Sequence, residues 1–204
     1  MAAVDKFEIT LRGHGSHGGY PHRSIDPIPA AAALIQSLQT IVSRNINAFS
    51  PAVVSVTRLS AGNTWNVIPE TAEMEGTVRT LSPEDRTQIE QTMKRMAEHI
   101  AAAHGCTAEM VWTRGSAAVI NDAGLCAEAR KVALAMGFEV DRQEDTMGAE
   151  DFSDYLQRRP GVFIRVGTGG GVESHHPAFL VEPEALAPAA EYFAQLAMAR
   201  TESV

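Results

Sequence analysis

The sequence has 204 residues, 45% of them hydrophobic, and 17 Lys and Arg against 25 Asp and Glu give a formal net charge of −8. This apolar content can fill a buried core, which excludes a disordered or fibrous protein. The acidic balance argues against a general nucleic-acid binder, because phosphate binding needs clustered Lys and Arg. No apolar run approaches the roughly 20 residues of a membrane helix, and two cysteines are too few for a disulfide framework. We therefore expect a cytoplasmic protein whose partners are small molecules or proteins, with no nucleic acid and no membrane.

The first half of the chain alternates between strand-like and helix-like patterns. Apolar residues occupy every second position over 6–12, the period of a strand with one buried face. Over 26–45, Asp26 can cap a helix whose apolar residues recur at steps of three and four. Further strands are predicted over 51–59, 72–80 and 106–114, with a second helix between Ser82 and Gly105. The order strand, helix, strand, strand, helix, strand is typical of the ferredoxin-like fold.

In that topology the strand over 51–59 lies at an edge of the sheet. Its residues 51–57 carry no charge, and an uncharged edge strand can pair with another chain. We therefore predict a homodimer joined along this strand and the helix over 26–45. The alternative is that a loop covers the edge.

After residue 115 the pattern changes. Asn121 and Asp122 can cap a third helix, and the last helix contains Leu186 and Leu196. Between them we predict a short strand over 138–140, a short helix over 150–157 and a strand over 161–166. These elements make a poor core by themselves, since both faces of a short parallel sheet need covering. We therefore expect a domain over 5–115 followed by an incomplete α/β portion over 116–204.

Three histidines, His14, His17 and His22, fall within a glycine-rich stretch between the first strand and the first helix. A self-contained zinc site is a weak interpretation, because the cluster lacks a carboxylate or thiolate and its spacing is irregular. A substrate-facing donor on a loop freed by glycine is favoured. For any single histidine, a structural loop remains the simplest alternative.

Other candidate residues have an ordinary structural explanation beside a functional one. The Asn66 amide could donate to an oxyanion, and Arg79 offers a fork for a carboxylate, but both also suit turns and strands. Glu150 and Asp151 stand at a helix start, where capping alone favours acids. The glycines over 167–171 do not form a phosphate loop, because no Lys-Ser or Lys-Thr follows them.

Several motifs nevertheless occur in the order known from one family. They are Pro21-His22, Ile25-Asp26-Pro27, Thr40-Ile41-Val42-Ser43-Arg44, Asn66-Val67-Ile68-Pro69, Gly76-Thr77-Val78-Arg79, Glu150-Asp151-Phe152 and His175-His176-Pro177. Across essentially all of its length the chain resembles the metal-dependent amidohydrolases that include hippurate hydrolase, N-acyl-amino-acid and auxin-conjugate hydrolases and, more distantly, carboxypeptidase G2. The resemblance implies hydrolysis of the amide bond of a small N-acyl amino acid by an enzyme that uses a pair of divalent metal ions, zinc, manganese or cobalt.

The resemblance also implies roles for particular residues. His17 matches a histidine of the family's lid domain that reaches the active site of the opposite subunit and polarises the scissile carbonyl. Asn66 matches a lid asparagine that contacts substrate, and Arg79 would contact a substrate carboxylate. His175 matches the last ligand of the two-metal site, and Glu150-Asp151 matches an acidic pair near that site; both acids are candidate substrate-binding residues. Residues 5–115 would then be the lid and dimerisation domain, and 116–204 the end of the catalytic domain.

The sequence departs from the family in its metal ligands. Family members carry a metal-binding histidine, a Glu-Glu pair and a further histidine or aspartate upstream of the lid, whereas this sequence has no Glu-Glu and no Asp-x-His, His-x-Asp or Cys-x-His. Residues 1–7 resemble an internal segment that directly precedes the lid. We therefore expect a C-terminal half of an enzyme that is inactive by itself. The alternatives are a non-catalytic dimerisation or ligand-binding module and one subunit of a split enzyme with a separate N-terminal half.

Overall fold

The chain divides into two compact units in the computed structural model, which describes residues 1–169, 171–172 and 174–201. The first unit comprises Met1–Val119 and Asp145–Asp154, and the second comprises Ile120–Glu144 and the residues from Tyr155 onward.

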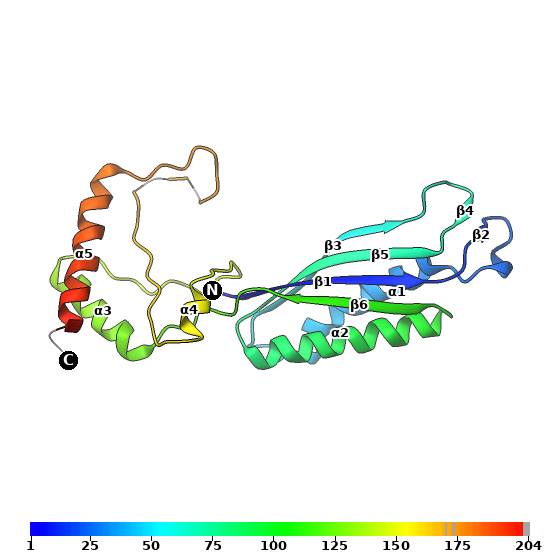
Figure 1. The fold of residues 1–204 in the computed structure, drawn as a ribbon, viewed down its shortest axis with the longest axis horizontal. Helices are drawn as coiled ribbons and strands as arrows, with labels where there is room; N and C mark the ends of the chain where they lie inside the picture. The colour runs from blue at the N-terminus through cyan, green and yellow to red at the C-terminus, as the bar shows by residue number, and fades with distance from the viewer. Residues whose placement is uncertain (170, 173, 202–204) are drawn as a thin grey trace. The chain divides into compact units, whose positions relative to one another are not determined.

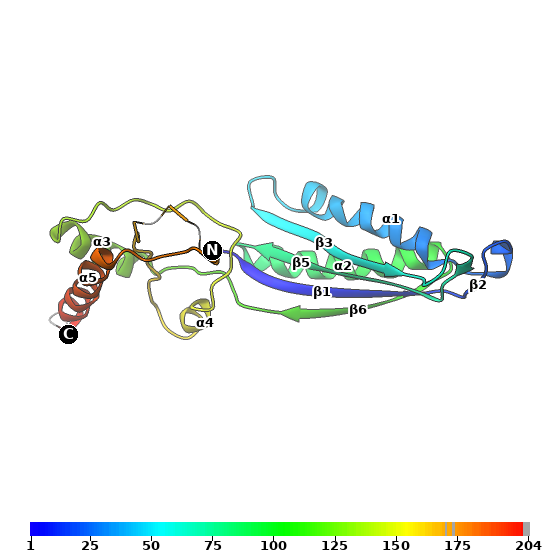
Figure 2. The ribbon, with the colours of Figure 1, turned by 90° about the horizontal axis from the view of Figure 1, so that it is seen from above.

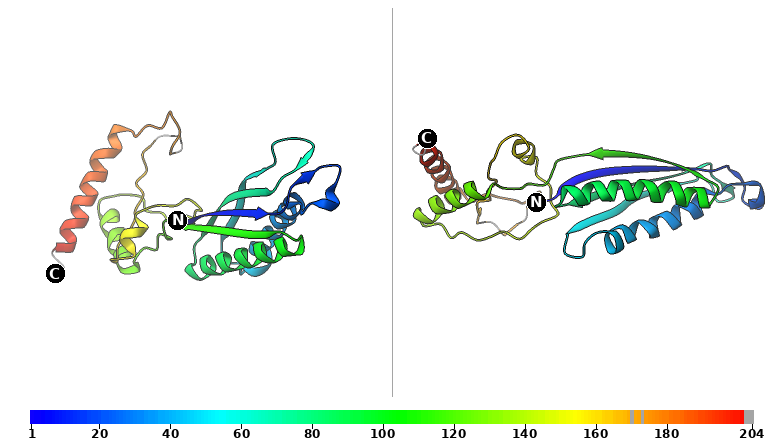
Figure 3. Two further views of the ribbon diagram at one scale, coloured as in Figure 1. Left: turned by 45° about the vertical axis from the view of Figure 1, so that its right-hand side comes forward. Right: turned by 90° about the horizontal axis from the view of Figure 1, so that it is seen from below.

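The first unit is built on a four-stranded antiparallel sheet with the order β3-β5-β1-β6 (Figure 1). The strands are β1 (Ala3–Arg12), β3 (Ala52–Ala61), β5 (Thr71–Thr80) and β6 (Thr107–Arg114). Two helices, α1 (Pro27–Thr40) and α2 (Pro83–Ala103), lie side by side on one face of this sheet, as Figures 2 and 3 show. The predicted ferredoxin-like order βαββαβ is confirmed.

The core lies between the helices and the inner face of the sheet. Every second residue of β1 and β5 is buried, as the period of two predicts. Gly76 on β5 is directly opposite Phe7 on β1, and a Cβ at Gly76 would lie 2.2 Å from the Phe7 ring. The absence of a side chain at Gly76 leaves room for the Phe7 ring. The largest side chains with less than 2% exposure in this core are Phe7, Ile9, Leu11, Leu34, Leu38, Ile41, Met74, Val78, Ile89 and Met93.

Capping residues set where the two helices begin. Asp26 Oδ1 accepts a hydrogen bond from the Ile28 N–H at 2.9 Å, and Ser82 Oγ accepts one from Asp85 N–H at 3.2 Å. The helix predicted over 26–45 is α-helical over Pro27–Thr40 and then continues as a π-helical turn over Ile41–Asn45. The long helix α2 is followed by Gly105, whose φ of +76° suits glycine.

The strand β3 lies at an edge of the sheet, as the sequence predicts. A bulge between Val56 and Arg58 inserts one unpaired residue into its ladder with β5. Because of this extra residue, Arg58 lies opposite Glu75 on the outer face of the sheet, where the two side chains form an ion pair. A straight strand would have turned Arg58 toward the apolar core.

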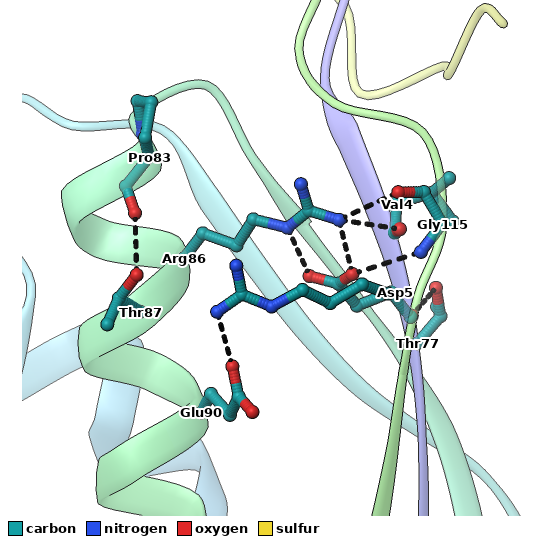
Figure 4. Close-up of polar contacts among 9 residues, drawn as sticks. Val4, Asp5, Thr77, Pro83, Arg86, Thr87, Glu90 and Gly115 are labelled. Carbon is teal, nitrogen blue, oxygen red and sulfur yellow. Dashed lines mark hydrogen bonds and ion pairs between the residues drawn. The ribbon is translucent and has the colours of Figure 1, made fainter. Parts of the chain in front are cut away.

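A buried ion pair ties the start of β1 to α2 and to the end of β6 (Figure 4). The Arg86 guanidinium donates two hydrogen bonds to the Asp5 carboxylate, from Nε at 2.8 Å and from Nη2 at 2.6 Å. Its Nη2 also donates to the Gly115 carbonyl at 2.9 Å. The side chains are 11% and 1% exposed, respectively. The hydrogen bond to Asp5 raises the pKa of Arg86, so the guanidinium stays charged. The alternating pattern of β1 places Asp5 among core residues but does not predict this partner.

The second unit contains α3 (Ala123–Ala135), packed against α5 (Pro183–Thr201). The buried Tyr192 joins them, since its hydroxyl donates to the Ala129 carbonyl at 3.1 Å. Apolar side chains on α5 remain exposed, at 60% for Leu186, 52% for Phe193 and 55% for Met198.

Three sequence predictions after residue 115 were wrong. Residues 138–140 and 161–166 form no strands, and the predicted helix over 150–157 shrinks to α4 (Ser153–Leu156). A strand needs a neighbour to pair with, and the second unit has no strand among its described residues. The segment around Phe163 instead bonds to a side chain, because Asn121 donates to its carbonyl at 2.9 Å and accepts from its N–H at 2.8 Å. No helix in the described ranges is long and apolar enough to cross a membrane.

Breaking the Asp5–Arg86 pair should destabilise the first unit strongly. Arg86→Ala leaves the buried Asp5 carboxylate without its cationic partner, with the Gly115 N–H still donating to it at 3.3 Å, and such a loss costs about 3–5 kcal/mol. The control is Arg114→Ala, which removes an ion pair with Glu90 that is 52% and 30% exposed and should cost about 1 kcal/mol or less. Urea unfolding followed by tryptophan fluorescence reports on the first unit, since Trp65 and Trp112 both lie there. Equal losses of unfolding free energy in the two variants would contradict a special stabilising role for the Asp5–Arg86 pair.

The two cysteines should differ in reactivity. Burial raises the pKa of the Cys106 thiol, and the negative charge of Asp26 raises it further. Less thiolate and less access slow its modification, whereas Cys126 is only half-buried. We expect a thiol reagent at pH 8 to modify Cys126 first and Cys106 only on unfolding, as followed by mass spectrometry. In Cys126→Ala the early phase should vanish; an early phase that persists would show that Cys106 is accessible.

Candidate functional site

The candidate catalytic residues His17 and Asn66 belong to two segments that pair at one end of the sheet (Figures 1 and 2). A two-residue strand β2 (Ser16–His17) follows β1, and another, β4 (Val67–Ile68), precedes β5. They pair antiparallel, with His17 opposite Val67, and Gly18 N–H donates to the Asn66 carbonyl at 2.7 Å. We call this β2–β4 ribbon, with its flanking residues 13–20 and 63–66, the tip.

Glycine is required in the tip because other backbone segments pass close by. A Cβ at Gly13 would lie 2.0 Å from the Ile25 carbonyl oxygen, and one at Gly15 would lie 2.7 Å from that of Ile68. Neither approach leaves room for a side chain. The glycine-rich stretch, which the sequence suggests is a flexible loop, is therefore packed closely against the backbone at Ile25 and Ile68.

The His17 imidazole is exposed and has a defined hydrogen-bonding direction. Its Nδ1 accepts the Gly19 N–H at 3.0 Å, and a nitrogen that accepts this bond cannot itself carry a proton. In the neutral ring the proton must then be on Nε2, which becomes a donor. The ring centroid lies 5.3 Å from that of Tyr20. His17 can thus offer one N–H to a carbonyl or an oxyanion.

Asn66, half-buried, has a comparable arrangement. The Thr64 hydroxyl donates to Asn66 Oδ1 at 3.2 Å, which leaves the amide NH₂ to donate elsewhere. Its neighbour Trp65 is 94% exposed. No role for Thr64 or for the Gly19 N–H is predicted from the sequence. The one signal is their position two residues from Asn66 and from His17, a spacing at which local turns are common.

Arg79 is not brought to the tip of its own chain. It lies on the outer face of β5, opposite Val4 on β1 and Val53 on β3. The tip precedes Thr71, eight residues earlier on the same strand, or about 27 Å at about 3.4 Å per residue. Its predicted contact with substrate remains a proposal.

Glu150 and Asp151 make local contacts at the start of α4. Glu150 Oε1 accepts from Phe152 N–H at 3.4 Å and its carbonyl from Ser153 N–H at 3.3 Å, while the Asp151 carbonyl accepts from Asp154 N–H at 2.9 Å. These contacts are those of a helical turn. They leave the Asp151 carboxylate exposed.

His175 is exposed and its φ of 70° is unusual for a residue with a side chain. The neighbouring His176 is differently engaged, since its Nδ1 accepts the Ala178 N–H at 3.1 Å. The neutral His176 therefore carries its proton on Nε2 and has no free lone pair for a metal. Of the pair, His175 is the better candidate ligand.

The described part of the chain does not by itself fit a metal centre. Nowhere in it do three or more His, Cys, Asp or Glu side chains gather so that they could hold an ion. His175 would supply one ligand of several.

Comparison with known proteins identifies the domain. A family model described as a peptidase dimerisation domain matches residues 4–105. These residues include strands β1, β3 and β5 of the sheet, both helices and the tip, and end before β6. Most of the first unit thus matches a peptidase dimerisation domain. The chain belongs to the M20 peptidase family, and the predicted family resemblance is confirmed.

The relatives are about twice as long as this chain. N-acetylcysteine deacetylase of Bacillus subtilis (strain 168) is 47% identical over 204 residues, covering 100% of this chain and 54% of that protein. N-acetyldiaminopimelate deacetylase of Bacillus licheniformis is 30% identical over 187 residues, or 91% of this chain and 50% of that protein. A Bacillus subtilis crystal structure described as a dinuclear metal-binding M20 peptidase superposes with a TM-score of 0.85 at 42% identity, covering 100% of this chain and 51% of that one.

Proposed function

We propose that this chain is the lid, dimerisation and C-terminal part of an amidohydrolase that cleaves the amide bond of N-acyl amino acids. The similar proteins named above are deacetylases of N-acetylcysteine and N-acetyldiaminopimelate, and both substrates are N-acyl amino acids. The domain limits 5–115 and 116–204 belong to this proposal, as does a cytoplasmic location, which suits a protein with two unpaired thiols.

The observation that carries the proposal is that His17 and Asn66 lie on adjacent backbone segments of the tip, where the Gly18 N–H donates to the Asn66 carbonyl. Hydrolysis of an amide passes through a tetrahedral intermediate whose oxygen becomes negative, and preorganised N–H donors stabilise that charge. His17 Nε2–H and the Asn66 NH₂ are two such donors, supplied by neighbouring backbone segments. Neither is buried within its own chain, so each is available to a substrate held by another surface.

Water activation in this proposal rests on a pair of divalent ions, zinc, manganese or cobalt, which would bring the pKa of a bound water toward 7. The described side chains gather no such centre, and we propose His175 as the one ligand from this chain. Arg79, Glu150 and Asp151 are proposed contacts for the charged groups of the substrate. We therefore propose that the isolated chain is inactive.

Activity assays test this proposal directly. The chain alone, supplied with zinc, manganese or cobalt, should not hydrolyse N-acetyl amino acids. Fused to the segment of the Bacillus subtilis N-acetylcysteine deacetylase that it does not match, it should become active. In the fusion, His17→Ala and Asn66→Ala should each lower kcat about 10²–10³-fold, the effect of removing one oxyanion donor.

The control is His22→Ala, which alters an exposed histidine of the same loop and should leave kcat within about threefold. Turnover by the isolated chain would refute its inactivity. An active fusion that tolerates His17→Ala would refute the oxyanion role.

We further propose that two copies associate along β3 and α1. The edge of β3 is open for pairing, and Ile28 on α1 is 45% exposed. In such a dimer His17 would act on the substrate held by the opposite subunit.

A charged substitution on each of the two edge strands should show which edge forms the dimer interface. Val53 on β3 and Val111 on β6 both lie on the outer face, on opposite edge strands. Val53→Lys should shift the protein to a monomer, because the two lysines would be brought together across the seam. Val111→Lys adds the same charge away from it and should leave a dimer. Sedimentation velocity measures both; a dimer that survives Val53→Lys and dissociates in Val111→Lys would place the seam on β6.

A second candidate is a subunit of a split enzyme or a non-catalytic binding module. The exposed apolar side chains of α5 favour the split enzyme, since a separate N-terminal half could cover them. Co-purification of this chain with the unmatched segment of the Bacillus subtilis relative, expressed as a separate polypeptide, supports the split enzyme. An amino-acid-like ligand that binds the chain alone without turnover supports the binding module.

A further inference from the structure

Phe49 is a large apolar side chain that its own chain leaves in water. It is 96% exposed and lies in the loop between the π-helical turn after α1 and the edge strand β3. Phenylalanine is usually buried, because its apolar ring is favoured out of water. A single exposed apolar residue is common on protein surfaces, but this one is held in a fixed loop beside an open sheet edge.

Hydrogen bonds fix the loop that carries Phe49. The Phe49 N–H donates to Asn47 Oδ1 at 3.0 Å, and the Ser50 N–H donates to the Asn47 carbonyl at 2.8 Å. The loop is also tied to α2, since Gln88 Nε2 donates to the Asn45 carbonyl at 2.8 Å. A loop that is already ordered loses less entropy when a partner covers it.

Two more exposed apolar side chains lie at the other end of the same edge. Leu59 on β3 is 52% exposed, although it lies opposite Met74, which is buried in the core. Residues directly opposite each other share one face of a sheet, so Leu59 is on the face that the helices cover. Ile28, near the start of α1, is 45% exposed. At this end α1 begins and β3 approaches the tip (Figure 2).

The length of β3 keeps these two ends apart within one chain. Ala52, where β3 begins, pairs with Thr80, and Leu59 pairs with Met74. The two partners are six residues apart on β5, or about 20 Å at about 3.4 Å per residue. The loop of Phe49 therefore lies at one end of the edge and Leu59 near the other.

Two-fold symmetry would bring the two ends together. If β3 and α1 both lie at the seam, as proposed above, the axis is perpendicular to the sheet, because only then are both α1 helices on the same side. The two β3 strands are then antiparallel, and each end of one lies beside the opposite end of the other. Pairing over the regular stretch Ala52–Val56 places the loop before Ala52 beside the partner's residues beyond Val56.

We propose that Phe49 of each copy docks against Leu59 and Ile28 of the partner subunit. The inference rests on the proposed dimer and adds the contact that fixes how the two β3 strands align. Strands that slip by two residues keep their hydrogen bonds and their faces, but the slip would separate Phe49 from Leu59. Because the interface is two-fold, the same contact forms at both ends of the seam.

A double-mutant cycle on the dimer Kd tests this contact. Phe49→Ala and Leu59→Ala should each raise the Kd about 10- to 100-fold, because each side chain is buried twice per dimer. Together they should raise it by less than the product of the single effects, since one contact can be lost only once. Sites about 20 Å apart in one chain do not couple, so this coupling would have to arise across the seam. Single effects that simply multiply, measured by sedimentation equilibrium, would overturn the proposal.

The matched control is Val111→Ala on the other edge strand. Val111 is 50% exposed, and its removal should change the Kd by less than about twofold; circular dichroism checks that each variant is folded. A wild-type chain that stays monomeric at about 100 μM would overturn both the dimer and the contact. A dimer that Val53→Lys dissociates but whose Kd is unchanged in Phe49→Ala would uphold the dimer and overturn the docking of Phe49.

Discussion

The register of β1 against β5 is the constraint from which the candidate site follows. Because Arg12 at the end of β1 lies opposite Thr71 at the start of β5, the chain leaving one strand and the chain entering the other must run side by side. The β2–β4 ribbon extends this pairing beyond the sheet and brings together two residues 49 positions apart, His17 and Asn66. At the other end of β1, the Asp5–Arg86 pair fixes the strand to α2 and so holds the same register.

Much of the first unit follows from the sequence, because each of its long elements has a clear period and a cap or breaker at its end. The strands around Phe7 and Val78 alternate, and Asp26 and Ser82 cap the helices where expected. The partner of Asp5 could not be predicted, since a buried carboxylate in an alternating strand gives no sign of which arginine it meets. Two-residue strands such as β2 and β4 are too short to have a detectable period.

Beyond residue 115 local patterns were a poorer guide. The apolar runs at 138–140 and 161–166 have the composition of strands, but a strand forms only against a neighbour, and the described residues of the second unit offer none. The roles of His17, Asn66 and His175 came from a family resemblance rather than from composition or spacing. What the resemblance could not supply is the direction in which each histidine hydrogen-bonds, which depends on the N–H groups of Gly19 and Ala178.

The bulge in β3 limits the length over which a strand of a second copy can pair with this edge. Between Ala52 and Val56 the strand is regular, but past the unpaired Thr57 its backbone is offset by one residue. A neighbouring strand that follows the first stretch would lose its alignment with the second, so a continuous sheet through two copies can use only about half of β3. The same bulge that keeps Arg58 out of the core thus limits pairing along this edge, and in the proposed dimer the rest of the contact would come from α1.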